Sequence, residues 1–243
     1  MSIDVAVIPA AGRGTRMRPA TRVVPKALIT VVDRPAIQYA VEEAARAGAK
    51  EAVVVVDLDA GHLIAQHFSV DGPLPGLEDI RVRPVVQEEP LGLGHAVYEA
   101  AEMVGDRPFF CLLSDNIVRP GQDVLEEMAG GSNEGGVSVM CLRRLTDEFL
   151  SKYGVVVPAS DVADGYLDLA GAVEKPGVEE APSRLGLVGR YLFTPEIFSI
   201  LNKTSPGVGG EIQLTDAINE LGNHGRLRGF VADSDLLDTG TPE

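Results

Sequence analysis

The sequence contains no apolar run that approaches the length of a membrane-spanning helix, so we expect no membrane-embedded segment. Its N-terminus lacks the basic segment, apolar segment and cleavage site of a secretory signal, which indicates a cytoplasmic protein. Only two cysteines occur, Cys111 and Cys141, and both lie in apolar strand-like stretches. We therefore expect reduced thiols in the core.

Positive charge is also scarce. The chain has 21 Lys and Arg against 36 Asp and Glu, which gives a formal net charge of −15. This balance argues against a nucleic-acid partner, because proteins that bind nucleic acids present clustered positive charge. It also means that an anionic small substrate must be met by local cations rather than by the field of the whole molecule.

The opening stretch concentrates these scarce cations. It begins with an apolar run at 5–8, which predicts a buried strand, and the run breaks at Pro9 into the glycine-rich AAGRGTR. A glycine-rich turn after a strand can point consecutive backbone N–H groups at a phosphate, because glycine lets the chain approach closely. Residues 13–26 hold five cations and no acid. The pattern predicts a phosphate-binding loop, with a solvated arginine-rich loop as the alternative.

Neither of the best-known phosphate-binding templates fits these glycines. A dinucleotide fingerprint that starts at Gly12 needs a glycine where the chain has Met17. A Walker A loop from Gly12 fails at the same position, and one from Gly14 meets Pro19.

Apolar runs alternate with amphipathic segments through the first half. We predict strands at 51–56, 81–86 and 108–113 and helices at 34–48, 60–68 and 94–103. This order predicts an α/β fold with a Rossmann-like, mixed and mostly parallel sheet flanked by helices. Ligands of such sheets bind beyond the carboxyl ends of strands, so the opening loop and Ser114-Asp115 should meet. In the second half we predict a strand at 137–142, strands of a smaller antiparallel element at 153–157 and 172–173, and helices at 195–201 and 213–221.

The opening stretch resembles the G-x-G-T-R-M-x-P…P-K signature of the sugar-phosphate nucleotidyltransferases. Within this family, Pro19-Ala20-Thr21, Pro25-Lys26, residues 188–191 (VGRY) and residues 210–216 (GEIQLTD) are most similar to the bacterial uridylyltransferase branch. The resemblance extends from Val5 to Pro242. It implies a single domain over 1–243, with a nucleotide-binding part at about 1–145 and a sugar-phosphate-binding part at about 146–243.

The resemblance also assigns the nucleotide site. It implies that Arg16 and Lys26 are catalytic cations, and that the nucleotide contacts Ala10, Ala11, Gly12, Gly14, Thr15, Gln87 and Gly92. The amide of Gln87 has one acceptor and two donors, which suit the edge of a pyrimidine base. A surface loop that starts a helix is the alternative for the segment 87–96. We expect His95 to be a satisfied helix residue rather than a catalyst.

Two aspartates are implied as Mg²⁺ ligands. Asp115 follows the strand at 108–113, and Mg²⁺ takes one or two carboxylates together with phosphate oxygens. The chain has Ser114 where many uridylyltransferases have proline, and a plain turn residue is the alternative for Asp115. Asp238 is the second implied ligand, and we expect a position so near the terminus to hold it less firmly.

The sugar side is assigned to Gly154, Glu174 and Lys175. Glu174 can accept hydrogen bonds from vicinal hydroxyls, while Lys175 can pair with the sugar phosphate as a catalytic cation. Glu211 is expected to support the pocket or to act as a helix-entry acid.

The implied reaction is Mg²⁺-dependent in-line attack of glucose 1-phosphate on UTP, which gives UDP-glucose and pyrophosphate. Two alternatives stay open: a thymidylyltransferase that uses dTTP, and a non-catalytic nucleotide-sugar-binding regulatory protein. The resemblance also leaves room for a homo-oligomer.

Overall fold

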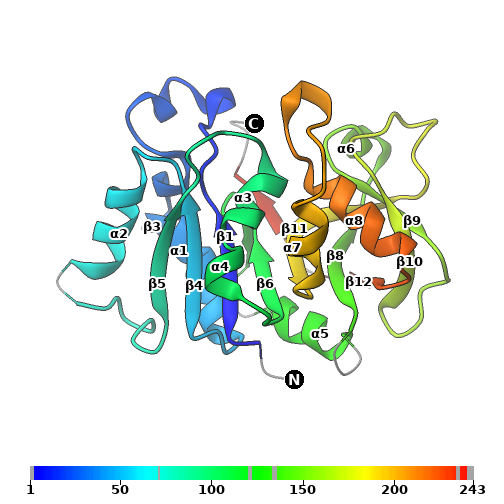
Figure 1. Ribbon diagram of the computed structural model, residues 1–243, viewed down its shortest axis with the longest axis horizontal. Coiled ribbons are helices and arrows are strands. Elements are labelled where there is room, and N and C mark those ends of the chain that lie inside the picture. The colour runs from blue at the N-terminus through cyan, green and yellow to red at the C-terminus, as the bar shows by residue number, and fades with distance from the viewer. Residues whose placement is uncertain (1–2, 71, 120–121, 133–135, 234–235, 240–243) are drawn as a thin grey trace.

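The computed structural model describes residues 3–70, 72–119, 122–132, 136–233 and 236–239. A nine-stranded sheet runs through the molecule in the order β5-β4-β1-β6-β11-β8-β12-β10-β9 (Figure 1). Its parallel half consists of β5 (Arg81–Val86), β4 (Glu51–Val56), β1 (Val5–Pro9) and β6 (Phe109–Leu112). The other half consists of β11 (Leu185–Phe193), β8 (Ser138–Arg144), β12 (Leu227–Val231), β10 (Tyr166–Val173) and β9 (Val155–Pro158). There, β8 and β12 are parallel and the other neighbours are antiparallel.

Helices cover both faces of this sheet. One face packs against α1 (Ala36–Arg46), α2 (Gly61–Ser69) and α5 (Val124–Gly130). The other packs against α3 (Leu93–Glu99), α4 (Ala101–Val104), α7 (Glu196–Leu201) and α8 (Leu214–Asn223). Along β1, Val5 and Val7 belong to the core of the second face and Ala6 and Ile8 to that of the first. This alternation explains why a strand buried on both sides reads as one continuous apolar run.

The remaining helices and strands of the described residues are short. They are the helix α6 (Asp147–Leu150), the 3-10 helices η1 (Thr15–Met17), η2 (Ala20–Arg22), η3 (Lys26–Leu28) and η4 (Val208–Gly210), and the strands β2 (Thr30–Val31), β3 (Arg34–Pro35), β7 (Asn116–Val118) and β13 (Leu236–Asp238). The pair β13–β7 is antiparallel, and it brings a segment near the C-terminus beside the strand that follows Asp115.

The predicted α/β class, with a mixed sheet flanked by helices, is confirmed. Antiparallel pairing extends further than expected, because β11 joins β6 to β8 and the antiparallel strands continue the main sheet. Both thiols are free and buried, as expected. Within the described ranges, no helix is long and apolar enough to cross a membrane.

Candidate active site

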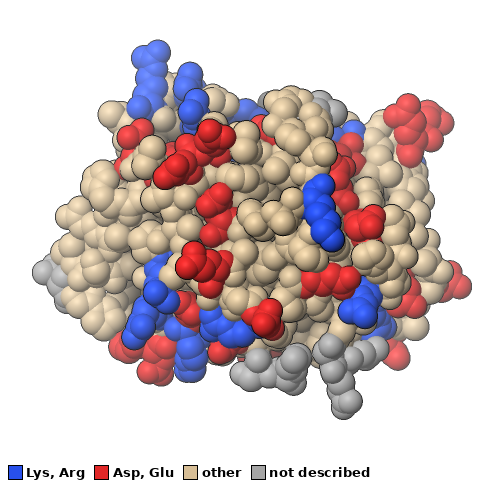
Figure 2. Space-filling model, viewed as in Figure 1, with Lys and Arg blue, Asp and Glu red and all other residues tan. Residues whose placement is uncertain are grey.

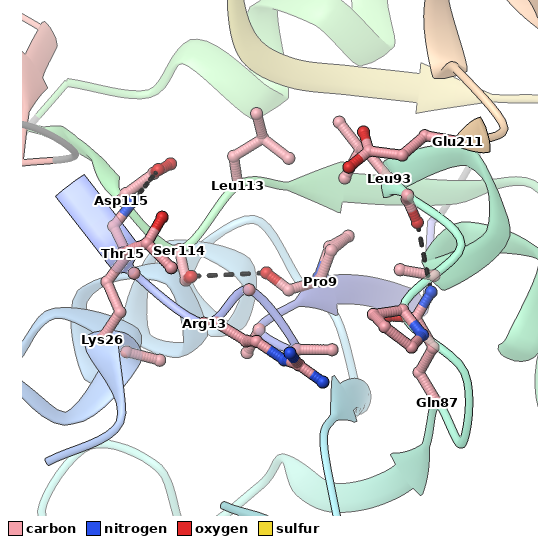
Figure 3. Close-up of a pocket in the computed structure, with 18 residues that line it drawn as sticks. Pro9, Arg13, Thr15, Lys26, Gln87, Leu93, Leu113, Ser114, Asp115 and Glu211 are labelled. Carbon is pink, nitrogen blue, oxygen red and sulfur yellow. Dashed lines mark hydrogen bonds and ion pairs between the residues drawn. The ribbon is translucent and has the colours of Figure 1, made fainter. Parts of the chain in front are cut away.

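A pocket of about 460 Å³ opens at the carboxyl ends of β1 and β6 (Figure 3). Its walls come from the opening loop, the segment after β5, the turn after β6 and the segment before α8. The lining residues are Pro9, Ala10, Ala11, Gly12, Arg13, Gly14, Thr15, Lys26, Ala27, Gln87, Pro90, Gly92, Leu93, Ala96, Leu113, Ser114, Asp115 and Glu211. The opening loop and the Ser114-Asp115 turn therefore meet, as the strand ends predicted. The hydroxyl of Ser114 donates to the carbonyl of Pro9 at 3.3 Å.

The two glycines of the opening loop have different structural roles. Gly14 has a φ of 57°, and a Cβ there would lie 2.9 Å from both Lys26 and Thr21. The Thr21 hydroxyl also donates to the Gly14 carbonyl at 2.7 Å. Gly12 instead faces open space, since a Cβ there would meet nothing within 4 Å. Gly14 is thus required by the packing of the loop, whereas Gly12 leaves room on the side of the pocket.

The cations of the loop divide between the pocket and the surface. Arg13 and Lys26 line the pocket, and Lys26 Nζ lies 2.5 Å from Asp115 Oδ2. Arg16 is exposed in η1 and is not among the residues that line the pocket, so its catalytic role stays a prediction. Figure 2 shows Lys and Arg side chains projecting over the opening loop, which Figure 1 places at the top left.

Gln87 lies at the other end of the pocket, with 7% of its surface exposed. Its Nε2 donates to the Gly92 carbonyl at 3.1 Å and to His95 Nδ1 at 2.9 Å. His95 Nε2 lies 3.0 Å from Glu99, so the tautomer with the proton on Nε2 satisfies both contacts. His95 is a satisfied helix residue, as expected. Because both amide donors are used, the Gln87 Oε1 atom is the group left to face a ligand.

Gly92 joins this end of the pocket to the segment before α8. Its φ is 100°, and a Cβ there would lie 2.7 Å from the Cβ of Glu211. Backbone bonds of 2.9 Å from Gly94 to Ile212 and of 2.7 Å from Ile212 to Leu91 hold the two segments together. This contact brings Glu211 into the pocket wall, in agreement with a supporting role.

The two predicted metal ligands lie on neighbouring segments. Asp238 pairs in register with Asn116, and the Thr239 N–H donates to the Asp115 carbonyl at 2.7 Å. Asp238 Oδ2 accepts from the Tyr153 hydroxyl at 3.0 Å. Burial, with the nearby Asp238 charge, raises the pKa of Tyr153 to about 12, which keeps this hydroxyl a donor. Asp238 is therefore held by strand pairing and by a side chain, more firmly than expected; 240–242 of its motif lie outside the described residues.

This donor set fits Mg²⁺. Two carboxylates offer hard oxygen ligands beside a pocket that is open to a phosphate. Within the described ranges, no group of three or more His, Cys, Asp or Glu side chains gathers as a metal cage. The residues present thus suit an ion that arrives with a nucleotide and is also held by its phosphates.

The sugar-side residues lie outside the lining of this pocket and form a cluster near Asp238. Glu174 accepts from the Thr215 hydroxyl at 2.7 Å and lies 2.8 Å from Lys175 Nζ. Lys175 has a φ of 45°, a conformation that costs energy outside glycine and that gathers at functional sites. A Cβ on Gly154 would lie 3.5 Å from Glu174 Oε2. Tyr153, the residue before Gly154, connects this cluster to Asp238.

Sequence reasoning assigned no specific contact to Arg190, Thr215, Tyr153 or Thr239, which support the site residues. Arg190 is fully buried in β11, where it binds Glu43 and the backbone around Asp115. A single charge inside an otherwise apolar run was the available signal, because a charge in such a strand must be paired. The three hydroxyl residues gave no comparable signal, since their contacts are made across the chain.

Comparisons with known protein families and with individual proteins point to the same family. Residues 5–243 match the nucleotidyl transferase family. The chain is 36% identical to a UTP–glucose-1-phosphate uridylyltransferase of Staphylococcus saprophyticus, over 98% of this chain and 88% of that protein. It is also 36% identical to the enzyme of that name from Bacillus subtilis, over 97% and 86% of the two chains.

Solved structures of enzymes of this kind also match the chain. A UDP-glucose pyrophosphorylase complexed with UDP-glucose superposes with a TM-score of 0.91 at 32% identity, over 98% of this chain and 94% of that one. The UTP-bound enzyme from Acinetobacter baumannii gives a TM-score of 0.83 at 33% identity, over 99% and 90%. The chain therefore belongs to the nucleotidyl transferase family, within its UTP–glucose-1-phosphate uridylyltransferases.

Proposed function

We propose that the protein transfers the uridylyl group of UTP to glucose 1-phosphate and releases pyrophosphate. The observation that supports this reaction most strongly is similarity along 98% of the chain to enzymes named for it. The site is chemically suited to the task, because a glycine loop, two cations and two carboxylates line one pocket.

The proposed reaction is a direct displacement. An oxygen of the sugar phosphate forms a bond to the α-phosphorus of UTP, and the bond from that phosphorus to the bridging oxygen of the β-phosphate breaks. Because the sugar phosphate is itself the nucleophile, no side chain needs to form a covalent bond. The protein contributes positioning and compensation of charge between two anions.

Before a substrate binds, each lysine of the site is paired with a carboxylate. Lys26 is paired with Asp115 and Lys175 with Glu174. Substrate phosphates would draw Lys26 to the α-phosphate and Lys175 to the sugar phosphate. The exchange would free Glu174 for sugar hydroxyls and Asp115 for the metal. Mg²⁺ held by Asp115 and Asp238 would neutralise phosphate oxygens and assist the departure of pyrophosphate.

Base selection is assigned to the Gln87 Oε1 atom. With both amide donors bound to Gly92 and His95, Gln87 offers an acceptor. Uracil and thymine present N3–H to such an acceptor, whereas cytosine presents a lone pair at N3. The geometry therefore favours UTP and dTTP over CTP, and the 5-methyl group becomes the main difference between the first two bases.

Pyrophosphate release in a mixture of UTP, glucose 1-phosphate and Mg²⁺ tests the proposal. An enzyme should release pyrophosphate only when all three are present, and the product should be UDP-glucose. A regulatory protein that binds nucleotide sugars would bind UTP without release, which would contradict the proposed reaction. The cytoplasmic location and the homo-oligomeric state stay predictions from the sequence, and sedimentation of the purified chain would test the second.

A further inference from the structure

We infer that the buried pair of Arg190 and Glu43 positions the turn that presents Asp115, and so governs how well the enzyme uses the metal of its nucleotide. The inference deepens the proposed function, since it rests on Asp115 as a metal ligand. Arg190 is a positioning residue, because it is not among the residues that line the pocket.

Arg190 is fully buried, and Glu43 in α1 is 5% exposed. The Arg190 Nε donates to Glu43 Oε1 at 3.0 Å, and Nη2 donates to Glu43 Oε2 at 2.8 Å. The remaining bonds go to backbone carbonyls. Nη1 donates to Leu113 at 3.1 Å and to Gly189 at 3.0 Å, and Nη2 donates to Asn116 at 2.5 Å. The carbonyls of Leu113 and Asn116 flank the two residues Ser114 and Asp115.

The other contacts of the turn show why its backbone needs this support. The Leu113 N–H donates to the Gly189 carbonyl at 2.9 Å, and Gly189 has a φ of 71°. A Cβ on Gly189 would lie 2.3 Å from Asn116 Nδ2, so β11 approaches the turn as closely as a glycine allows. On its other side, Thr239 donates its N–H and its hydroxyl to the Asp115 carbonyl. Arg190 and Thr239 thus clamp the backbone of the turn from two directions.

Stability alone does not account for this pair. Burying two charges carries a desolvation penalty that a well-packed apolar pair of similar volume avoids. An apolar pair, however, cannot donate hydrogen bonds to the carbonyls on both sides of Asp115. A lysine would keep the charge but lose the planar fork that reaches a carboxylate and several carbonyls at once. Holding the turn is therefore the task that the guanidinium performs and that its substitutes cannot.

The test is the UTP dissociation constant measured by calorimetry, once with EDTA and once with Mg²⁺. The constant in EDTA divided by the constant in Mg²⁺ is the ratio that reports how much the metal strengthens UTP binding. We expect Arg190→Lys to reduce this ratio by about 10- to 100-fold, the range seen when residues behind metal ligands are changed. The constant in EDTA should stay close to the wild-type value, because no metal is bound under that condition. Arg184→Lys is the matched control, because Arg184 is exposed just before β11 and pairs with Asp147, and it should change neither value.

The combination with Asp115→Asn separates positioning from general structural damage. If Arg190 acts through Asp115, Arg190→Lys should have no further effect on the ratio in the Asp115→Asn background. Additive losses, or an equal loss of affinity in EDTA, would overturn the inference. If a thermal melt shows that Arg190→Lys does not fold, Glu43→Gln is the variant to use instead. It keeps the guanidinium and should also reduce the ratio of the two UTP dissociation constants, but by a smaller factor. An Asp115→Asn variant with the wild-type ratio would contradict the proposed metal site, and this inference with it.

Discussion

Several side chains of the site have protein partners that a substrate must replace. Lys26 and Lys175 are held by the carboxylates of Asp115 and Glu174. These pairs are partly exposed, so they are weak compared with contacts to a phosphate in a closed site. In the proposed reaction the paired lysines would keep the carboxylates from repelling an incoming anion and would then move to its phosphates.

The first prediction concerns Asp115. Asp115→Asn should keep the fold, because an amide of the same shape replaces a half-buried carboxylate. It should lower the Mg²⁺-dependent kcat by about 100-fold, the scale seen when one group that stabilises transition-state charge is removed. Steady-state kinetics across a Mg²⁺ series and a thermal melt measure the two effects. A variant with near wild-type kcat would place the metal elsewhere.

The second prediction concerns the sugar side. Glu174→Ala should raise the KM for glucose 1-phosphate far more than the KM for UTP, because a hydroxyl acceptor is lost. Lys175→Ala should weaken every sugar phosphate, because a phosphate cation is lost. Thr215→Val, which removes the hydroxyl that orients Glu174, should follow Glu174→Ala with a smaller effect. Equal losses for UTP and sugar phosphate in both alanine variants would refute this division of roles.

Among the elements, the opening loop illustrates how two glycines of one motif differ. The third prediction is that Gly12→Ala leaves the unfolding free energy within about 0.5 kcal/mol, because its φ is not left-handed and the space is open. Its KM for UTP should rise by about tenfold, the loss of one or two backbone hydrogen bonds of about 1 kcal/mol each.

Gly14→Ala is the matched comparison. The left-handed φ alone costs about 1–2 kcal/mol, and the added methyl would press on Lys26 and Thr21. We therefore expect a measurable loss of stability together with the loss of UTP affinity. Denaturant titration of both variants measures the difference, and two variants of equal stability would show that the loop packs otherwise.

The elements also show what the sequence could and could not predict. Strands such as β1 and β4 were recognisable because burial on both faces leaves one apolar run, and α1 because its apolar positions recur at helical spacing. β11 was not predicted, because Gly189 and Arg190 interrupt its pattern. Its contacts with Glu43 and the Asp115 turn are long-range, and neither side of a long-range contact is visible along the chain. The contacts of Thr215 with Glu174 and of Tyr153 with Asp238 are also long-range, so they could not be predicted from the sequence.

At the scale of the whole molecule, one continuous sheet brings the predicted nucleotide and sugar residues together. β11, from the second half of the chain, lies between β6 of the first half and β8 of the second. The strand β13 then returns to β7, so that Asp238 and Tyr153 connect the Asp115 turn to the sugar-side cluster. The order of the motifs could be read from the sequence, but this connection depends on the topology.

The fourth prediction uses two thiols in the middle of that sheet. Burial raises the pKa of Cys111 and of Cys141 to about 12. The unfolded thiols ionise near their ordinary pKa of about 8.5, so the stability that the buried thiols contribute is complete below that pH and is lost as pH rises towards 12. At about pH 9, alkylation by iodoacetamide should therefore proceed only through transiently opened molecules, far more slowly than for a free thiol. Labelling of the native protein at the rate of a free thiol would contradict the buried placement.

The fifth prediction tests uridylyl transfer most directly, through the specificity constants for UTP, dTTP and CTP with glucose 1-phosphate as acceptor. UTP should exceed dTTP by about 10- to 200-fold, the discrimination that a single methyl group provides. CTP and the purine triphosphates should be rejected more strongly, and Gln87→Ala should narrow the gap between the bases. A preference for dTTP, or base selection unchanged in Gln87→Ala, would contradict the account.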